Sequence, residues 1–490
     1  MKNICKLFLF TPLFMSLLFS CGGGNQGNII PPEDENPIDP PIQEPEKTEK
    51  YRSVDIYCLN DFHGSFTYDK EEGQTGFGRI GKFLKDKKDK NPDDTIILSV
   101  GDMWQGGVES NKTKGNIISE AMNIVGFDAM AIGNHEFDWG EEAIKANNEI
   151  MNFPLISSNI FYSKDNSRPE YLVPSITLNK NGVKVGIIGA GSKYLGDDIL
   201  ATISKDFVFK DPITYIKQES EKLKEEKCDL ILLATHDGGF SGRVFNYSEL
   251  TKGEDPCVDA IFLGHDHKAK SGSKNDVPYI EAGSNGKYVA NIKFDLELVD
   301  GAYKVKEYRY ENITTFNNSL FESSLELIDS LIEKYKDLIG DINRVIYEFS
   351  RSLNRNAFLG IVNTSIAYYL NAHNDKYHTK IQAAFHNSGG IRSDVSSGRF
   401  TYKDLIKVCP FNNTLVIMKV NEAQYFEIKG TFGTGAYIPN EVDFSKGYAY
   451  VGTINFVSEQ DNIYALEKIY TGVVIQDAIE YYLINNPGLY

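Results

Sequence analysis

Short apolar runs rich in branched side chains alternate with amphipathic stretches from Tyr51 onwards. The clearest runs are VDIYCL, TIILSV, DAMAIG, VKVGIIGA, DLILLA and DAIFLG, which begin at residues 54, 95, 128, 183, 229 and 259. Runs of this length predict buried β-strands, and the amphipathic stretches between them predict helices. The alternation therefore indicates an α/β protein with mixed sheets.

The pattern changes after the strand-like segments ANIKFDLEL and KVKEYRY. The next apolar residues follow the 3-4 spacing of an amphipathic helix, and they are Leu325, Ile328, Ile332, Tyr335 and Ile339. We predict one helix from Ser323 to Gly340 and interpret segment 316–340 as a linker helix between two domains. A helix packed onto either domain would show the same stripe. A second, smaller mixed α/β domain is expected over residues 341–490.

The amino terminus has the features of a signal peptide over residues 1–20. Two lysines flank the start of an apolar run at residues 7–19, which is too short to span a bilayer. The segment ends in Leu-Phe-Ser-Cys and resembles a bacterial lipobox with Cys21 as the lipidated residue. We expect an extracytoplasmic protein anchored to a bacterial membrane, with ordinary secretion as the alternative. The Gly-, Pro- and acid-rich residues 21–50 are expected to be a disordered tether.

Length and charge narrow the classes of function. A chain of 490 residues is long enough for two large domains. Its formal net charge of −17 argues against nucleic-acid polymers as partners, because few basic groups are available to neutralise phosphates. A small phosphorylated ligand remains compatible, since metal ions and single arginines act at contact distance.

The cysteines show no metal-binding spacing. After processing, four remain: Cys58, Cys228, Cys257 and Cys409. Both a Cys228–Cys257 disulfide and buried thiols are compatible with this pattern.

Polar motifs directly follow five of the apolar runs. Their candidate residues are Asp61 and His63, then Asp102, then Asn134, His135 and Asp138, then His236, and finally His265 and His267. Loops at the carboxyl ends of strands converge on one crevice in an open α/β sheet, so we expect these side chains to meet. Carboxylate, amide and imidazole groups suit two divalent ions that share a carboxylate. This ligand set is compatible with Zn, Mn, Mg, Fe or Co.

The ordered motifs DxH, GD, GNHE, a single His and GHxH resemble the metallophosphoesterase family, specifically its 5'-nucleotidase branch, over residues 52–300. The resemblance implies a β-sandwich flanked by helices at 51–315. It also implies a ligand set in which Asp61, His63 and His267 bind one metal, Asn134, His236 and His265 bind the other, and Asp102 bridges the two.

The same resemblance implies two catalytic residues. His135 would donate a hydrogen bond or a proton to the leaving group, and Asp138 would orient its ring. A helix cap is the alternative role for Asp138. Two ions about 3.5 to 4 Å apart hold a hydroxide in line with the phosphorus and neutralise the phosphoryl oxygens.

Two motifs in the second domain suit a nucleotide. HNSGGIR at 386–392 places Arg392 where a guanidinium can grip a phosphate, and VCPFNN at 408–413 places Phe411 beside Asn413 for contact with a base. These motifs resemble the 5'-nucleotidase C-terminal domain over 341–465. The resemblance implies that Asn387 and Arg392 hold the substrate and that Phe411 and Phe456 sandwich the base. Without it, both phenylalanines would be assigned to the core.

Two features of this domain match the family less well. Arg351 and Arg355 lie near the region of further phosphate-binding arginines, but their spacing does not superimpose, and surface arginines are the alternative. The segment Gln460–Tyr464 lacks the glycines that the family has after its second aromatic residue. Ribose contact through this segment is therefore in doubt.

The sequence as a whole predicts an extracytoplasmic, metal-dependent 5'-nucleotidase that releases nucleoside and phosphate. A 2',3'-cyclic-nucleotide phosphodiesterase or a UDP-sugar hydrolase is the alternative within the same chemistry. A surface lipoprotein that binds nucleotides without catalysis is the alternative in another class. The sequence predicts no oligomeric state.

Overall fold

The computed structural model describes residues 49–70, 72–238, 247–460 and 462–490. The signal peptide predicted at 1–20, the lipidated Cys21 and nearly all of the tether up to residue 50 lie outside the described residues, as does Asp461. Residues from 49 onwards belong to one compact unit. In the described part of the chain the helices are too short or too polar to span a bilayer.

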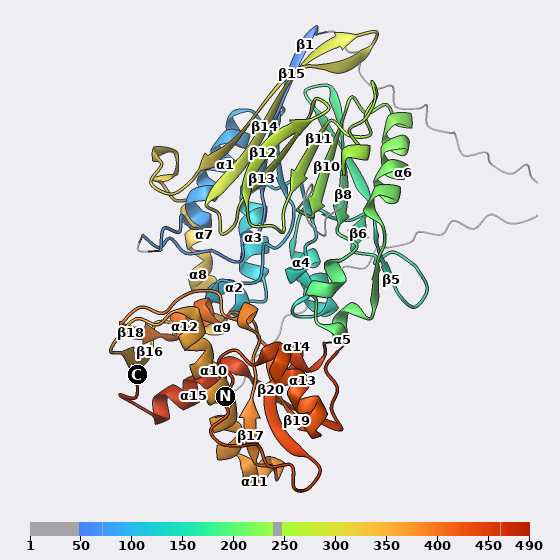
Figure 1. Ribbon diagram of the computed structural model, residues 1–490. Helices are drawn as coiled ribbons and strands as arrows, with labels where there is room; N and C mark the ends of the chain where they lie inside the picture. Colours follow the sequence, from blue (N-terminus) through green and yellow to red (C-terminus); the bar gives the residue numbers. More distant parts are fainter. Residues whose placement is uncertain (1–48, 71, 239–246, 461) are drawn as a thin grey trace, which may run out of the picture. The chain divides into compact units, whose positions relative to one another are not determined.

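Two stacked sheets form the amino-terminal part of the described chain (Figure 1). One has the order β15-β14-β1-β2-β3-β4-β6 and the other the order β12-β13-β11-β10-β8-β7. The strands of the first are β1 (Tyr51–Leu59), β2 (Thr95–Ser99), β3 (Ala129–Ala131), β4 (Leu155–Ile156), β6 (Leu172–Val173), β14 (Tyr288–Val299) and β15 (Ala302–Thr314). Those of the second are β7 (Ser175–Lys180), β8 (Val183–Gly191), β10 (Leu230–His236), β11 (Ala260–Leu263), β12 (Ala269–Lys274) and β13 (Val277–Ala282). Each predicted apolar run of this part coincides with one of these strands.

The alternation of side chains along each strand builds the layers. On β1, Val54, Ile56 and Cys58 pack between the two sheets, whereas Tyr57 and Leu59 face helices on the other side. The helices on that side include α1 (Phe77–Lys90), α3 (Asn116–Val125) and α4 (Glu141–Ile150), and α6 (Pro212–Glu225) covers the outer face of the second sheet. This arrangement confirms the expected β-sandwich flanked by helices.

The carboxyl-terminal part has its own sheet, with the order β17-β20-β19-β21 among the described residues. Its strands are β17 (Ile381–Ala384), β19 (Thr414–Val420), β20 (Ala449–Ile454) and β21 (Glu467–Val474). Helices α10 (Arg355–Ala372) and α15 (Ile475–Asn485) cover one face, and α13 (Glu422–Phe432) covers the other. The strands β16 (Val345–Phe349) and β18 (Gly398–Thr401) pair beside this sheet. The predicted mixed α/β fold of this part is confirmed.

The predicted continuous helix from Ser323 to Gly340 is wrong. The structure divides it into α7 (Glu326–Asp329), α8 (Leu331–Lys334) and α9 (Lys336–Ile339). At each break one carbonyl accepts bonds from both the third and the fourth following residue. The Ser330 carbonyl accepts from the Glu333 and Lys334 amides at 3.1 and 3.3 Å, and the Tyr335 carbonyl accepts from the Leu338 and Ile339 amides, both at 3.0 Å.

The apolar stripe of this segment is nevertheless buried. Ile328, Leu331 and Ile339 join the core cluster of the amino-terminal part, beneath α1 and α3. Glu120 on α3 holds the segment by accepting a 2.6 Å hydrogen bond from the Tyr335 hydroxyl and by pairing with Lys334. The segment is therefore packed onto the amino-terminal part, as the alternative interpretation of the stripe allowed.

The four cysteines among the described residues are thiols. Cys58 and Cys409 are buried, while Cys228 and Cys257 are half-buried. The structure therefore contains Cys228 and Cys257 as thiols and not as a disulfide.

Candidate metal centre and substrate cavity

Four loops and one strand end, all at the carboxyl ends of parallel strands, bring the predicted metal ligands together. Strands β1, β2 and β3 run parallel in the first sheet, and β8, β10 and β11 run parallel in the second. The loops after β1, β2 and β3 carry Asp61, His63, Asp102 and Asn134. His236 is the last residue of β10, and His265 and His267 follow β11. The strand order thus delivers the polar groups to one edge of the sandwich.

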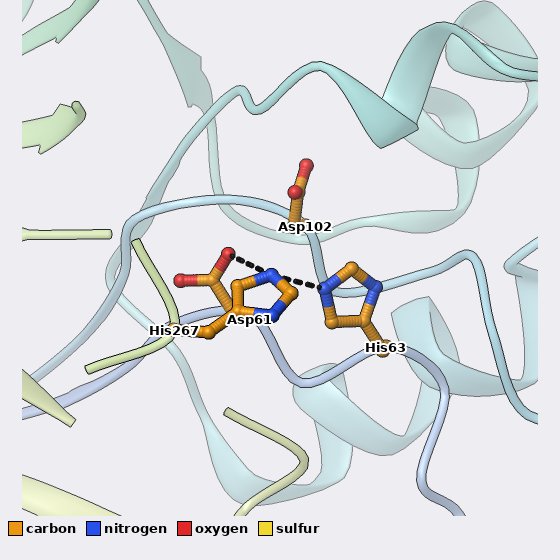
Figure 2. A group of neighbouring side chains, drawn as sticks. All are labelled: Asp61, His63, Asp102 and His267. Atoms are coloured by element: carbon orange, nitrogen blue, oxygen red, sulfur yellow. Dashed lines mark hydrogen bonds and ion pairs between the residues drawn. The ribbon is translucent and has the colours of Figure 1, made fainter. Parts of the chain in front are cut away.

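Among the described residues the ligand atoms form two groups that share one carboxylate. The first contains Asp61, His63, Asp102 and His267, and the second contains Asp102, His236 and His265, with the ligand atoms of each group within 4.8 Å of one another. Figure 2 shows the first group, in which the His63 Nε2 and His267 Nε2 atoms face each other at 3.0 Å.

Asn134 completes the second group. Its Oδ1 atom lies 3.2 Å from His236 Nε2 and 3.1 Å from His265 Nδ1. The Asp102 Oδ2 atom lies 3.1 Å from the same His236 Nε2. All seven predicted ligands are therefore in contact with at least one other predicted ligand.

The donor set fits divalent cations. Asp61 Oδ1 is buried and accepts no hydrogen bond from the described residues, although His267 Nε2 lies 3.3 Å away. A buried carboxylate oxygen left without a donor is costly unless a cation or water satisfies it. Burial lowers the pKa of His63 to about 3, which keeps its imidazole neutral as ligation requires.

The charges around His236 favour a cation in the same way. Burial opposes its protonation, but Asp102 and Asp61 outweigh burial and raise the pKa of His236 to about 10. The field that would hold a proton on this ring also favours a divalent cation between the carboxylates, because both neutralise the same negative charge.

Five of the seven candidate ligands have left-handed backbone conformations. Their φ angles are 46° for Asp61, 49° for His63, 54° for Asp102, 80° for His265 and 59° for His267. Each such conformation costs a non-glycine residue on the order of 1–3 kcal/mol and persists only where surrounding contacts impose it. The loops are therefore strained in a way that aims the ligands inwards.

Glu136 supplies one of these contacts, and the sequence analysis assigned it no role. Its buried carboxylate accepts hydrogen bonds from the backbone amides of Asp102 and Gly133 at 2.8 Å and of Met103 at 2.9 Å. Burial and the charge of Asp102 raise the pKa of Glu136 to about 7, while the amide donors act in the opposite direction. The acid inside GNHE was the only sequence signal for this role.

Asn60 has a similar role beside Asp61 and was also missed. Its Nδ2 donates to Asp61 Oδ2 and to the Gly283 carbonyl, both at 2.7 Å, and its Oδ1 accepts from the Ala282 amide at 2.7 Å. One buried side chain thus ties the loop after β1 to the loop after β13.

His135 and Asp138 lie in contact beside the metal ligands. His135 Nδ1 is 2.9 Å from Asp138 Oδ2, and the His135 amide donates to Asp102 Oδ1 at 2.9 Å. Burial opposes protonation of His135, but the carboxylates of Asp138 and Asp102 outweigh it and raise the pKa to about 9. The ring is thus held in one orientation with Nε2 left for another partner.

A cavity of about 370 Å³ opens from the metal ligands towards the carboxyl-terminal part. All five of the closely matching substrate-binding candidates line it, namely Asn387, Arg392, Phe411, Asn413 and Phe456. The Phe411 ring is stacked near His135, with ring centres 5.6 Å apart and planes inclined by 28°. Trp139, Asp198 and Leu200 also line the cavity and were not predicted from the sequence.

The two remaining candidate arginines, Arg351 and Arg355, have different positions relative to the cavities. Arg355 lines a neighbouring cavity of about 1050 Å³, which shares Gln105, His267, Gly389 and Arg392 with the first. Arg351 lines neither cavity, nor do the described residues of the segment 460–464. Arg351 therefore has the position of a surface arginine in this structure.

Comparison with protein families identifies both parts of the chain. The calcineurin-like phosphoesterase model matches residues 54–269, and the 5'-nucleotidase C-terminal domain model matches residues 344–424, together more than half of the chain. The chain belongs to the 5'-nucleotidase family of metallophosphoesterases. Members of the calcineurin-like group use two divalent metal ions, in agreement with the predicted cofactors.

Individual relatives agree with this assignment. The metallophosphoesterase described here is 26% identical to an apyrase of Tabanus yao over 80% of this chain and 75% of the relative. It is 26% identical to a 5'-nucleotidase of Vibrio cholerae over 81% of this chain and 79% of the relative. The structure of a 5'-nucleotidase precursor from Thermus thermophilus superimposes with a TM-score of 0.69 at 19% identity, covering 89% of this chain and 96% of that one, which shows a common fold.

Proposed function

We propose that this metal-dependent phosphoester hydrolase acts on nucleoside phosphates outside the cytoplasm and releases nucleoside and phosphate. The observation that supports this most is the shared position of Asp102. Its carboxylate belongs to both groups of ligand atoms and also lines the cavity that contains Phe411 and Phe456. A phosphate bound to cations at Asp102 would therefore leave its nucleoside in the part of the cavity that Phe411 and Phe456 line.

The metal ligands are proposed as in the sequence analysis, with Asp61, His63 and His267 on one cation, Asn134, His236 and His265 on the other, and Asp102 on both. When bound, the two cations supply positive charge to the phosphoryl oxygens and lower the pKa of water. The protein keeps this ligand set fixed through Glu136 and Asn60, because those side chains hold the loops on which the ligands lie.

We assign phosphate binding, proton donation and base stacking to side chains of the protein. Arg392, whose guanidinium carbon lies 5.6 Å from the centre of the Phe411 ring, would bind the phosphate. His135, oriented by Asp138, would donate a proton from Nε2 to the leaving oxygen, since its Nδ1 is engaged by the carboxylate. Phe411 and Phe456 would stack on the base, and Asn387 and Asn413 would donate or accept hydrogen bonds at the substrate.

The larger cavity supports a second candidate, hydrolysis of a phosphodiester such as a UDP-sugar or a cyclic nucleotide. It meets the first cavity at His267 and Arg392, so a phosphate at the metal centre has room on both sides. Amide and hydroxyl side chains line it, including Ser65, Thr67 and Asn285, and these suit a group rich in hydroxyls. A monoester would leave this space to water.

Product analysis of reactions with AMP, ATP, UDP-glucose and 2',3'-cyclic AMP tests these two candidates. Nucleoside and free phosphate are the products of AMP hydrolysis, whereas cleavage of UDP-glucose or of the cyclic ester gives phosphomonoesters. We expect release from the 5'-nucleotides to require a divalent cation and to stop with a chelator. The cation series should include Zn, Mn, Mg, Fe and Co. Activity that survives complete chelation would contradict the proposal, and a strong preference for the cyclic ester or for UDP-glucose would favour the second candidate.

The proposed location rests on Cys21 and the apolar run before it. We propose that lipid on Cys21 anchors the enzyme to a bacterial membrane. Mass spectrometry of the mature amino terminus measures this directly, with Cys21→Ser as the comparison. An unmodified mature chain that starts elsewhere would contradict it.

A further inference from the structure

Helix α2 (Val108–Lys112) connects the metal centre to the carboxyl-terminal part. It follows the loop that carries Asp102. The Val108 side chain is buried in the same apolar cluster as Leu405 and Ile406 of helix α12 (Tyr402–Val408). A short helix of the metal-binding part is therefore packed into the core of the substrate-binding part.

Asn111 on this helix makes two hydrogen bonds in opposite directions. Its Oδ1 accepts from the Gly106 amide at 2.8 Å, and its Nδ2 donates to the Pro410 carbonyl at 2.8 Å. The side chain is buried, with 6% of its surface exposed. One amide thus joins the loop after Asp102 to the residue that precedes Phe411.

The Gly106 end of this connection reaches a metal ligand candidate. The carbonyl of Gln105 lies 3.0 Å from His63 Nδ1, and the Gly107 amide donates to the His63 carbonyl at 2.8 Å. A bond from Nδ1 to a carbonyl sets which ring nitrogen is left to bind a metal. The position of the Gly106 backbone is therefore tied to the orientation of His63.

The Pro410 end reaches the proposed base-stacking ring. Gln476 on α15 donates to the carbonyls on either side of Pro410, at 2.7 Å for Cys409 and 2.9 Å for Phe411. The Pro410 carbonyl between them is held by Asn111. The backbone that carries Phe411 thus has one anchor within its own part and one from the metal-binding part.

We propose that Asn111 is a positioning residue that sets the distance and orientation of Phe411 relative to the metal centre. This inference rests on the proposed function, because it takes Phe411 as the surface for the nucleobase. Substrates that carry a base depend on Asn111, since they contact both ends of the connection. Phosphate esters without a base bind at the metal centre alone and do not depend on the Pro410 bond.

Asn111→Asp separates the two bonds. The carboxylate still accepts from the Gly106 amide but has no proton to donate, and its charge repels the Pro410 carbonyl. We expect kcat/KM for AMP to fall at least about tenfold, chiefly through KM, because the buried Pro410 carbonyl loses its donor and no longer holds the backbone that carries Phe411. The kcat/KM for p-nitrophenyl phosphate should stay within about threefold of the wild type.

Lys112→Ala provides the matched control. Lys112 is the next residue of α2 and also contacts the carboxyl-terminal part, since its Nζ donates to the Tyr402 hydroxyl at 3.0 Å. It contacts neither Gly106 nor Pro410, so we expect the ratio of the two kcat/KM values to stay as in the wild type. An equal change of the ratio in Lys112→Ala and Asn111→Asp would overturn the inference, because any weakened contact of α2 would then suffice.

The outcomes distinguish this inference from the proposed function. A wild-type enzyme that does not hydrolyse AMP contradicts the proposed function before any variant is made. If the wild-type enzyme hydrolyses AMP, Asn111→Asp tests the positioning role alone. Equal losses for AMP and p-nitrophenyl phosphate, or no loss for either, would overturn that role. If Asn111→Asp does not fold, Asn111→Ser removes both bonds without adding charge. Both substrates should then lose activity, and the loss should be larger for AMP, because only AMP also depends on the Pro410 bond.

Discussion

At the residue scale, the contact between His135 and Asp138 makes a prediction about leaving groups. His135→Ala should lower kcat for AMP by about 10² to 10⁴, because a positioned general acid contributes that much. The loss should be clearly smaller for p-nitrophenyl phosphate, whose leaving group departs without a proton. Steady-state rates on the two substrates measure this. Equal losses on both would show that His135 acts on metal or phosphate binding instead.

Glu136 makes a second prediction at the same scale. A glutamine at this position keeps the shape but turns one acceptor towards the backbone amides into a donor. Glu136→Gln should therefore loosen the loops of Asp102 and Gly133 and weaken metal binding by about 10- to 100-fold. Metal titration followed by activity gives the affinity. Glu142→Gln is the matched control, since the Glu142 side chain is 88% exposed, and a similar effect there would contradict the assigned role.

The residues missed by sequence analysis share a physical reason. Asn60, Glu136 and Asn111 act by bonding backbone groups of loops that are distant along the chain. No spacing or periodicity marks such a partner in advance. The metal ligand candidates were predictable because each lies at or just after the carboxyl end of a strand, and the carboxyl ends of parallel strands meet at one edge.

At the element scale, Asp259 immediately precedes β11, and its pKa predicts how the stability of the fold depends on pH. Burial raises the pKa of Asp259 from 3.8 to about 6, although its carboxylate accepts a 2.7 Å bond from the Ile231 amide on β10. The folded state then binds the proton more tightly than the unfolded state. The contribution of Asp259 to the free energy of unfolding is therefore greatest below pH 4 and declines as the pH rises through about 6.

Asp259→Asn removes this titration. The free energy of unfolding of the variant minus that of the wild type should be more positive at pH 7 than at pH 4.5. In other words, the variant is more stable relative to the wild type at pH 7, and urea denaturation measures this. Glu142→Gln serves as the control here too, because the Glu142 side chain is 88% exposed. A difference between variant and wild type that does not change with pH would contradict the assignment.

In the segment 316–340, the spacing of apolar residues predicted the buried face but not the number of helices. Three short helices and one continuous helix place Ile328, Leu331 and Ile339 on the same side, so the apolar stripe cannot distinguish them. The structure places the breaks at Ser330 and Tyr335, positions that the stripe does not mark. Strands such as β8 and β10 were predicted more accurately, because a short run of branched apolar residues is more compatible with a buried strand than with a helix.

At the scale of the whole molecule, both halves of the chain line the proposed substrate cavity. The larger cavity is lined by His63 and Lys287 on one side of the sequence and by Arg355 and Lys403 on the other. The sequence motifs predicted that both halves would contribute. They could not predict the second cavity, because its walls depend on how α2 and α12 pack.

Val108 lies in an apolar cluster formed otherwise by residues of the carboxyl-terminal part. Recombination at the linker would separate this side chain from the pocket that receives it. A chimaera that exchanges carboxyl-terminal halves between relatives therefore has to carry a matching α2 as well. In evolution, the two halves of this enzyme are expected to change together at that helix, even though their sheets are separate.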